Sequence, residues 1–141
     1  MQTTNTSNIT IQISLNVPIE KAWDYWTNPK HITNWYFASD DWHAPHAEND
    51  VQPGGTFKTT MAAKDGSFGF DVSGKYTSVE EYRTLEFVLD DGRKVKINFE
   101  PDGENIRVIE SFEAESTNSL ELQKTGWQAI LDNFKKYAEA V

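Results

Sequence analysis

Residues 118–141, NSLELQKTGWQAILDNFKKYAEAV, decide the fold of this 141-residue chain. Asn118, followed by Glu121, predicts the start of a helix, because a short polar side chain caps free backbone amides and a carboxylate is favourable in the first turn. Apolar residues then recur at intervals of three and four, which places them on one helix face. These residues are Trp127, Ile130, Leu131, Phe134, Tyr137, Ala138 and Val141. Such a stripe needs a broad apolar surface, and a curved sheet supplies one.

The chain before this helix begins with a strand and two short helices. Residues 9–17 alternate apolar and polar side chains, the period of a strand with one buried face. A helix is expected to start at Pro18 and to break at Asn28-Pro29, and a second short helix runs through about Trp35. Residues 36–53 have no clean period and contain two prolines, three aromatics and two histidines. They are predicted to be a long ordered loop, and such loops in compact domains are often functional.

Three turns predict an antiparallel meander between residues 57 and 112. They are a two-residue turn at Asp65-Gly66 with positive φ at both residues, a three-residue loop at 90–92 and a two-residue turn at Asp102-Gly103. In each case inward side chains meet inward side chains across the hairpin, which supports the register. The predicted partners are, in order, Met61–Phe70 and Ala63–Phe68, Phe87–Val95 and Glu86–Lys96, then Phe99–Ile106, Ile97–Val108 and Val95–Glu110.

Composition narrows the class of protein. The formal net charge is −9 and the pI is near 4.7, which disfavours nucleic acid and anionic membranes as partners because the field repels polyanions. The basic cluster Arg93, Lys94 and Lys96 is interpreted as a solvated strand face. The absence of cysteine excludes disulfides, thiolate metal sites and a cysteine nucleophile. With no signal peptide or long apolar run, we expect a cytoplasmic monomer or weak dimer, with one domain at 9–141 after a frayed or disordered segment at 1–8.

Four stretches resemble a known family. They are VPIEKAWDYWTNPKHITNWY at 17–36, PGGTF at 53–57, AAKDGSFGFDVSGKYTSV at 62–79 and GWQAILDNFKKY at 126–137. The chain is similar there to bacterial START-related proteins grouped with the C-terminal domain of activators of the heat-shock-protein-90 ATPase. The resemblance extends from about Ile9 to Tyr137. It implies an α+β helix-grip fold of the birch-pollen-allergen-like superfamily, with a curved antiparallel sheet of six or seven strands around the C-terminal helix and two short helices after the first strand.

The resemblance implies three functions. The preferred interpretation is a non-enzymatic protein that binds a small apolar or aromatic ligand in a cavity between sheet and C-terminal helix. The alternative is a co-chaperone-like stimulator of a heat-shock-protein-90 ATPase with a role in stress response. The eukaryotic activators have a separate N-terminal domain, for which this chain has no room, and this counts against that alternative. A further alternative is a cyclase or hydrolase-like enzyme, as found elsewhere in the superfamily.

Inward aromatic and aliphatic side chains are the candidates for a ligand cavity, because small-molecule pockets are mainly apolar with a few polar groups. Ordinary core packing explains any one of them, but five tryptophans in so small a chain are more than a core needs. The candidate ligand-binding residues are Trp35, Trp42, Phe57, Met61, Phe70, Tyr76, Phe87, Glu110, Trp127, Ile130 and Leu131.

Glu110 is the one carboxylate on the inward face of the last predicted strand. Burial should raise its pKa above the usual range and make it a candidate catalytic acid or base. His43 is the second catalytic candidate, because its loop could close the cavity mouth. In the alternative interpretation Glu110 hydrogen-bonds to Tyr76 or a tryptophan indole, or a bulge turns it outward.

Two further features have competing interpretations. His43 and His46, with Glu48 and Asp50 nearby, offer metal-ligand chemistry, but two ordinary loop histidines explain them as well, and neither a metal nor a cofactor is predicted. Gly126 lies inside the long helix at a cost of about 1 kcal/mol relative to alanine. The missing side chain predicts the close approach of a strand or of a bound ligand.

Overall fold

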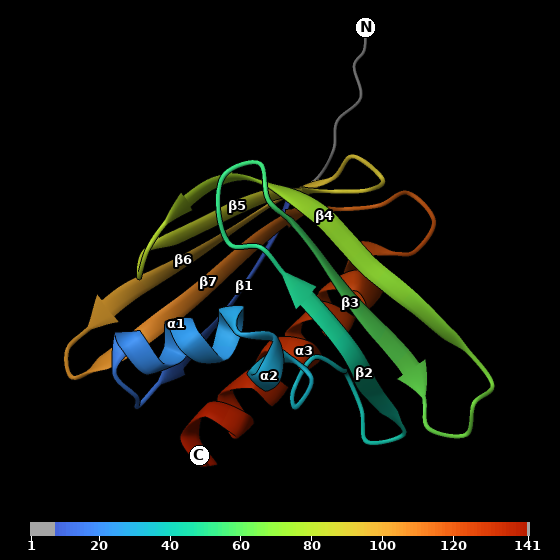
Figure 1. Ribbon diagram of the computed structural model, residues 1–141, viewed down its shortest axis with the longest axis horizontal. Coiled ribbons are helices and arrows are strands. Elements are labelled where there is room, and N and C mark those ends of the chain that lie inside the picture. Colours follow the sequence, from blue (N-terminus) through green and yellow to red (C-terminus); the bar gives the residue numbers. More distant parts are fainter. Residues whose placement is uncertain (1–7, 141) are drawn as a thin grey trace, which may run out of the picture.

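The computed structural model describes residues 8–140. Within them, one antiparallel sheet has the strand order β1-β7-β6-β5-β4-β3-β2. The strands are β1 (Asn8–Leu15), β2 (Trp42–Asn49), β3 (Thr56–Ala63), β4 (Gly69–Glu80), β5 (Thr84–Leu89), β6 (Lys94–Asp102) and β7 (Asn105–Glu113). The helices are α1 (Ile19–Thr27), α2 (Pro29–Ile32) and α3 (Leu120–Ala140). The sheet curls around α3, and α1 and α2 lie beside it (Figure 1), as the predicted helix-grip architecture requires.

Helix α3 is docked by the predicted stripe, but its cap is different. Ser119 is the cap, because its Oγ accepts a hydrogen bond from the Leu122 backbone N–H at 3.1 Å. The predicted capping residue, Asn118, was therefore wrong by one position. Leu131, Phe134 and Ala138 are fully buried, Trp127, Ile130 and Tyr137 are partly buried, and Val141 lies outside the described residues.

Strand β1 begins one residue earlier than predicted. The predicted frayed segment, residues 1–8, lies outside the described residues except for Asn8, which pairs with Glu113 of β7. Alternate side chains of β1 are buried, from Ile9 to Leu15. This alternation confirms the one-sided burial that the sequence pattern predicts.

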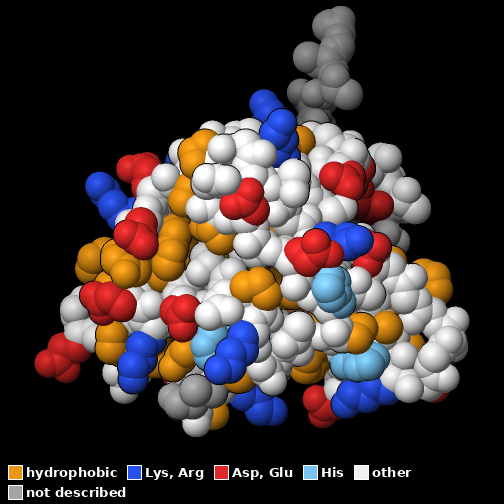
Figure 2. Space-filling model, viewed as in Figure 1, with side chains coloured by type: hydrophobic (Ala, Val, Ile, Leu, Met, Phe, Trp, Pro, Cys, Tyr) orange, Lys and Arg blue, Asp and Glu red, His pale blue; other side chains and the backbone are white. Residues whose placement is uncertain are grey.

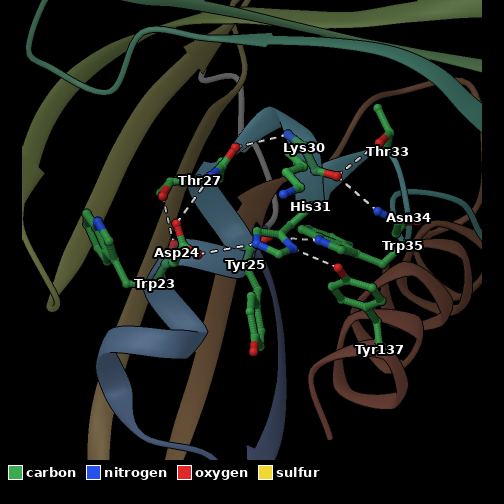
Figure 3. Close-up of polar contacts among 11 residues, drawn as sticks. Trp23, Asp24, Tyr25, Thr27, Lys30, His31, Thr33, Asn34, Trp35 and Tyr137 are labelled. Atoms are coloured by element: carbon green, nitrogen blue, oxygen red, sulfur yellow. Dashed lines mark hydrogen bonds and ion pairs between the residues drawn. The ribbon is translucent and has the colours of Figure 1, made fainter. Parts of the chain in front are cut away.

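A polar cluster joins α1, α2 and the end of α3 (Figure 3). The His31 Nδ1 lies 2.7 Å from the Tyr137 hydroxyl, and its Nε2 lies 3.3 Å from Asp24 Oδ2. Asn28 ends α1 and caps α2 by accepting from the Lys30 N–H at 3.0 Å, so the predicted break is confirmed. Helix α2 ends at Ile32 rather than near residue 35.

The predicted loop at 36–53 contains a strand, and the prediction was wrong there. Strand β2 pairs with β3 at the edge of the sheet, with a bulge between His43 and His46. Pro45 falls within that bulge. An edge strand tolerates proline because its outer N–H groups have no sheet partner.

Two of the three hairpin registers are confirmed, since Met61 pairs with Phe70 and Phe87 with Val95. The predicted register of the third hairpin, between β6 and β7, was wrong by two residues. The turn lies at Gly103-Glu104, so that the actual partners are Phe99–Val108, Ile97–Glu110 and Val95–Phe112. A shift of two keeps every side chain on its predicted face. The inward orientation of Glu110 therefore survives the wrong register.

The first hairpin has the predicted pairing but a different turn. Gly66 has a φ of 79°, whereas Asp65 has no positive φ, so the expected turn with two left-handed residues is not formed. The backbone N–H of Ala63 donates to the Phe68 carbonyl at 2.8 Å, as the pairing requires. Phe68 is not on a buried face: it is 61% exposed and contacts the edge of Trp42.

Surface charges of both signs are interspersed over the face seen in Figure 2. No helix within residues 8–140 is both long enough and apolar enough to cross a membrane.

Candidate ligand-binding cavity

Two cavities lie on the concave side of the sheet. The outer cavity, of about 290 Å³, is between the sheet and α3, and the inner cavity, of about 40 Å³, is between the sheet and the α1–α2 segment. Trp26, Tyr36 and Glu110 border both and form the wall between them. A hollow of about 190 Å³ adjoins the outer cavity and shares Met61 and Phe70 with it.

The inner cavity is small because three aromatic rings pack against one another there. Phe57 lies 5.4 Å from Tyr76 and 4.9 Å from Phe87 between ring centroids. The Tyr76 hydroxyl donates to Asn49 Oδ1 at 2.6 Å, and Asn49 in turn donates to the Thr27 carbonyl at 2.7 Å. A cavity of about 40 Å³ has room for a few water molecules but not for an organic ligand.

Apolar side chains dominate the outer cavity. They come from α3 and from the facing strands, and are Met61, Phe70, Val72, Leu89, Trp127 and Ile130. The Trp127 ring is held in place by stacking on Phe112, with centroids 3.7 Å apart and planes 10° apart. A fixed aromatic wall of this kind offers a flat ligand a pre-formed contact surface.

Glu110 is the polar group at the inner end of the outer cavity. It is only 7% exposed, which confirms that it points inward. Burial raises the pKa of Glu110 to about 8, so the carboxyl is mainly protonated at neutral pH. Within residues 8–140 no hydrogen bond joins Glu110 to Tyr76 or to a tryptophan indole; Tyr76 donates to Asn49, and the Trp35 indole donates to the Tyr25 carbonyl at 2.9 Å. The β6–β7 register has no bulge, so the alternative in which a bulge turns Glu110 outward is wrong.

Tyr36 lies beside Glu110 and was not among the predicted site residues. Burial raises the pKa of the Tyr36 hydroxyl, and the negative charge of ionised Glu110 raises it further. The residue follows α2 in an irregular segment, so no strand or helix period indicates which way it points. Only the folded chain brings it to the wall between the cavities.

Arg93 is the polar group near the opposite end of the outer cavity. Its Nε donates to Asp91 Oδ2 at 2.8 Å, and its guanidinium carbon lies 6.0 Å from the centre of the Trp127 ring. The assignment of Arg93 to a solvated strand face was wrong, although Lys94 and Lys96 are exposed as predicted. Arg93 has the same parity as Val95 and Ile97, and this signal places it on the inward face.

The predicted ligand-binding residues divide among these spaces. Met61, Phe70, Glu110, Trp127 and Ile130 line the outer cavity, and Trp35, Phe57, Tyr76, Phe87 and again Glu110 line the inner one. Trp42 lines the adjoining hollow. Leu131 is fully buried and lines neither cavity.

The predicted catalytic partner His43 lies apart from Glu110. It is next to Trp42 in β2 and lines neither cavity that Glu110 borders. Because Trp42 lines the adjoining hollow, strand alternation directs His43 to the opposite face. His46 pairs with the exposed Glu48 at 2.7 Å, and residues 8–140 contain no group of three or more candidate metal ligands. Acid–base chemistry by Glu110 stays a prediction.

Gly126 borders the outer cavity from α3. A Cβ atom at this position would have no neighbouring atom within 4 Å. The predicted close approach of a strand is therefore wrong, and the missing side chain instead leaves cavity space open.

A curved antiparallel sheet around a long C-terminal helix, with an apolar cavity between them, defines a START-related helix-grip domain. Residues 16–139 match the family described as Activator of Hsp90 ATPase homolog 1-like protein, and the chain belongs to this family.

Solved structures of similar proteins agree with this assignment. The AHSA1-like protein from Aeromonas hydrophila is 44% identical, with a TM-score of 0.86 over 94% of this chain and 93% of that protein. Chr148 from Cytophaga hutchinsonii is 50% identical, with a TM-score of 0.82 over 94% and 92%. A protein from Chromobacterium violaceum shares the fold at 18% identity, with a TM-score of 0.84 over 94% and 98%. No curated protein matches this chain.

Proposed function

We propose that this protein binds a small, largely apolar molecule in the outer cavity. The cavity volume of about 290 Å³ is near the lower end of the range for small-molecule pockets, roughly 300–1,000 Å³. It is about twice the volume of an apolar protein cavity, roughly 150 Å³, that holds benzene. A ligand with two fused rings therefore matches the space.

The observation that carries the proposal is the glycine in α3. Glycine inside a helix costs about 1 kcal/mol relative to alanine, and no neighbouring atom requires its presence at Gly126. The side chain that alanine or leucine would place there points into the outer cavity. The chain thus forgoes helix stability at a position that borders the cavity, where a larger side chain would occupy ligand space.

Thermal-shift measurements with two-ring aromatics, fatty acids and sterols test the proposal. A ligand that binds the folded state raises the melting temperature. Gly126→Leu should abolish that shift by filling the cavity, while Gly126→Ala, which adds one carbon atom, should keep most of it. If no compound of the panel binds the wild-type protein, or if Gly126→Leu binds as well as wild type, the outer cavity is not the ligand site.

A second candidate function, stimulation of a heat-shock-protein-90 ATPase, is favoured by the family to which the chain belongs. Phe68 and Phe70 are 61% and 42% exposed at the end of the β3–β4 hairpin, and exposed aromatics are typical of protein contacts. An ATPase assay with wild type and Phe68→Ser separates this function from ligand binding. If a saturating concentration of the wild-type protein does not stimulate the ATPase, this second candidate function is wrong.

A further inference from the structure

We propose that the ligand of the outer cavity is an aromatic carboxylate with a carbonyl group at its far end. The carboxylate pairs with Arg93, and the carbonyl accepts a hydrogen bond from Glu110. This inference rests on the proposed function, since it names the class of molecule that the same cavity binds.

The inner end of the cavity offers one unused hydrogen-bond donor. Glu110 is 93% buried, and its carboxyl group makes no hydrogen bond with any residue in the described range 8–140. The titratable groups that border its two cavities are Tyr36, Tyr76, Glu48 and Arg93. Burial alone accounts for its raised pKa, so none of them acts as a counter-charge. A protonated carboxyl without a partner recovers the free energy of a lost hydrogen bond when a ligand supplies an acceptor.

The other end of the cavity offers a cation. Asp91 uses only the Nε of Arg93, which leaves the two terminal amino groups to form a forked pair with a carboxylate. Arg93 precedes Ile97 by four residues, and Ile97 lies directly opposite Glu110. At roughly 3.4 Å per strand residue, the backbone positions of Arg93 and Ile97 are about 14 Å apart along the sheet. A ligand must therefore be elongated to reach both Arg93 and Glu110.

The polar groups also exclude the reverse orientation and a cationic ligand. A ligand carboxylate next to Glu110 would be buried without a positive partner, which is unfavourable. An ammonium group would share the cavity with Arg93 and be repelled by it. The apolar middle, between Trp127 and Ile130 on one side and Val72 and Leu89 on the other, fits a pair of fused rings.

Three naphthalene derivatives test the proposal on the wild-type protein by calorimetry. 6-Acetyl-2-naphthoic acid has both polar ends, 6-isopropyl-2-naphthoic acid has the same shape without the acceptor, and 2-acetylnaphthalene lacks the carboxylate. At pH 6 we expect each of the two incomplete compounds to bind about tenfold more weakly than the complete one, the value of one hydrogen bond to a charged or buried partner. Because only protonated Glu110 donates, the complete compound should bind about tenfold more weakly at pH 9 than at pH 6.

Variants assign each polar end to its residue. Glu110→Gln keeps a donor at every pH, so acetyl should still be preferred over isopropyl while the pH dependence disappears. Glu110→Leu should bind both naphthoic acids equally. Arg93→Met keeps an apolar stem beside Trp127 and should weaken both naphthoic acids about tenfold while leaving 2-acetylnaphthalene unchanged. Far-UV circular dichroism checks that each variant is folded.

The outcomes separate this inference from the function on which it rests. If the three compounds and naphthalene itself bind equally well, the cavity is a ligand site but its polar ends do not select the ligand, and the inference is wrong. If none of them binds and the wider panel fails too, both proposals are wrong. Tighter binding of the 6-aminomethyl analogue than of the acetyl compound at pH 9 would assign an ion pair to Glu110 and overturn the inference.

Discussion

Replacing Glu110 by glutamine should change how the stability of the protein depends on pH. The folded protein holds the Glu110 proton up to a pKa of about 8, whereas the unfolded chain releases it near 4.5. Between these values the folded state binds more protons than the unfolded state, so the free energy of unfolding falls as pH rises. Glutamine has a similar shape and no proton to lose, which removes this dependence.

The size of the effect follows from the two pKa values. Each pH unit between them lowers the free energy of unfolding of the wild type by about 1.4 kcal/mol. From pH 5 to pH 7.5 the loss is about 3 kcal/mol, a large part of the 5–15 kcal/mol that typically stabilises a domain. At pH 5 the neutral acid and the amide are similar buried groups, and the two proteins should differ by about 1 kcal/mol or less. At pH 7.5 Glu110→Gln should be the more stable protein by about 3 kcal/mol.

Urea unfolding followed by tryptophan fluorescence at pH values from 5 to 9 measures this difference. Glu104→Gln is the matched control, because it removes one carboxylate from an exposed turn and should leave the pH profile of the wild type unchanged. Subtracting the profiles removes the contribution of every other titrating group. A difference between wild type and Glu110→Gln that stays constant with pH would refute the argument that burial governs this carboxyl.

Three further substitutions, with Lys136→Ala as an exposed control, test the docking and the shape of α3 by the same unfolding measurement. Gly126→Ala should stabilise the protein by about 1 kcal/mol, since the added carbon enters open space, and a loss of stability would mean that this space is filled. Phe134→Ala should cost about 3–5 kcal/mol because the ring is fully buried, while the exposed Lys136→Ala should change stability by less than about 0.5 kcal/mol. Tyr137→Phe should cost about 1 kcal/mol by removing the hydrogen bond to His31, and an unchanged stability would show that this bond contributes nothing.

Side-chain parity predicted more of the site than turn chemistry did. Parity places Glu110 inward although its predicted cross-strand partner, Val95, is two residues away from the actual one, Ile97. The same rule applied to Arg93 locates the cation of the cavity. Parity depends only on the period of the strand, whereas the exact partner depends on which two residues make the turn.

The remaining parts of the site depend on contacts between distant segments. Tyr36 has no periodic neighbour, and its place beside Glu110 follows from how the α1–α2 segment packs on the sheet. Strand β2 contains Pro45, a residue typical of loops, and only its position at the sheet edge makes a strand possible there. The size of each cavity depends on how side chains from different strands pack, as Phe57 and Phe87 do. No local sequence pattern encodes such contacts.

The pairing of β1 with β7 has a consequence for synthesis of the protein in the cell. Strand β1 is synthesised before the other strands of the sheet, and it must wait on the ribosome until β7, the last strand, has emerged before it finds its neighbour. During that interval the alternating isoleucines of β1, at 9, 11 and 13, face the solvent on an unpaired strand. The β3–β6 meander, whose strands are neighbours in sequence, can form earlier and provide a surface on which β7 and then β1 assemble.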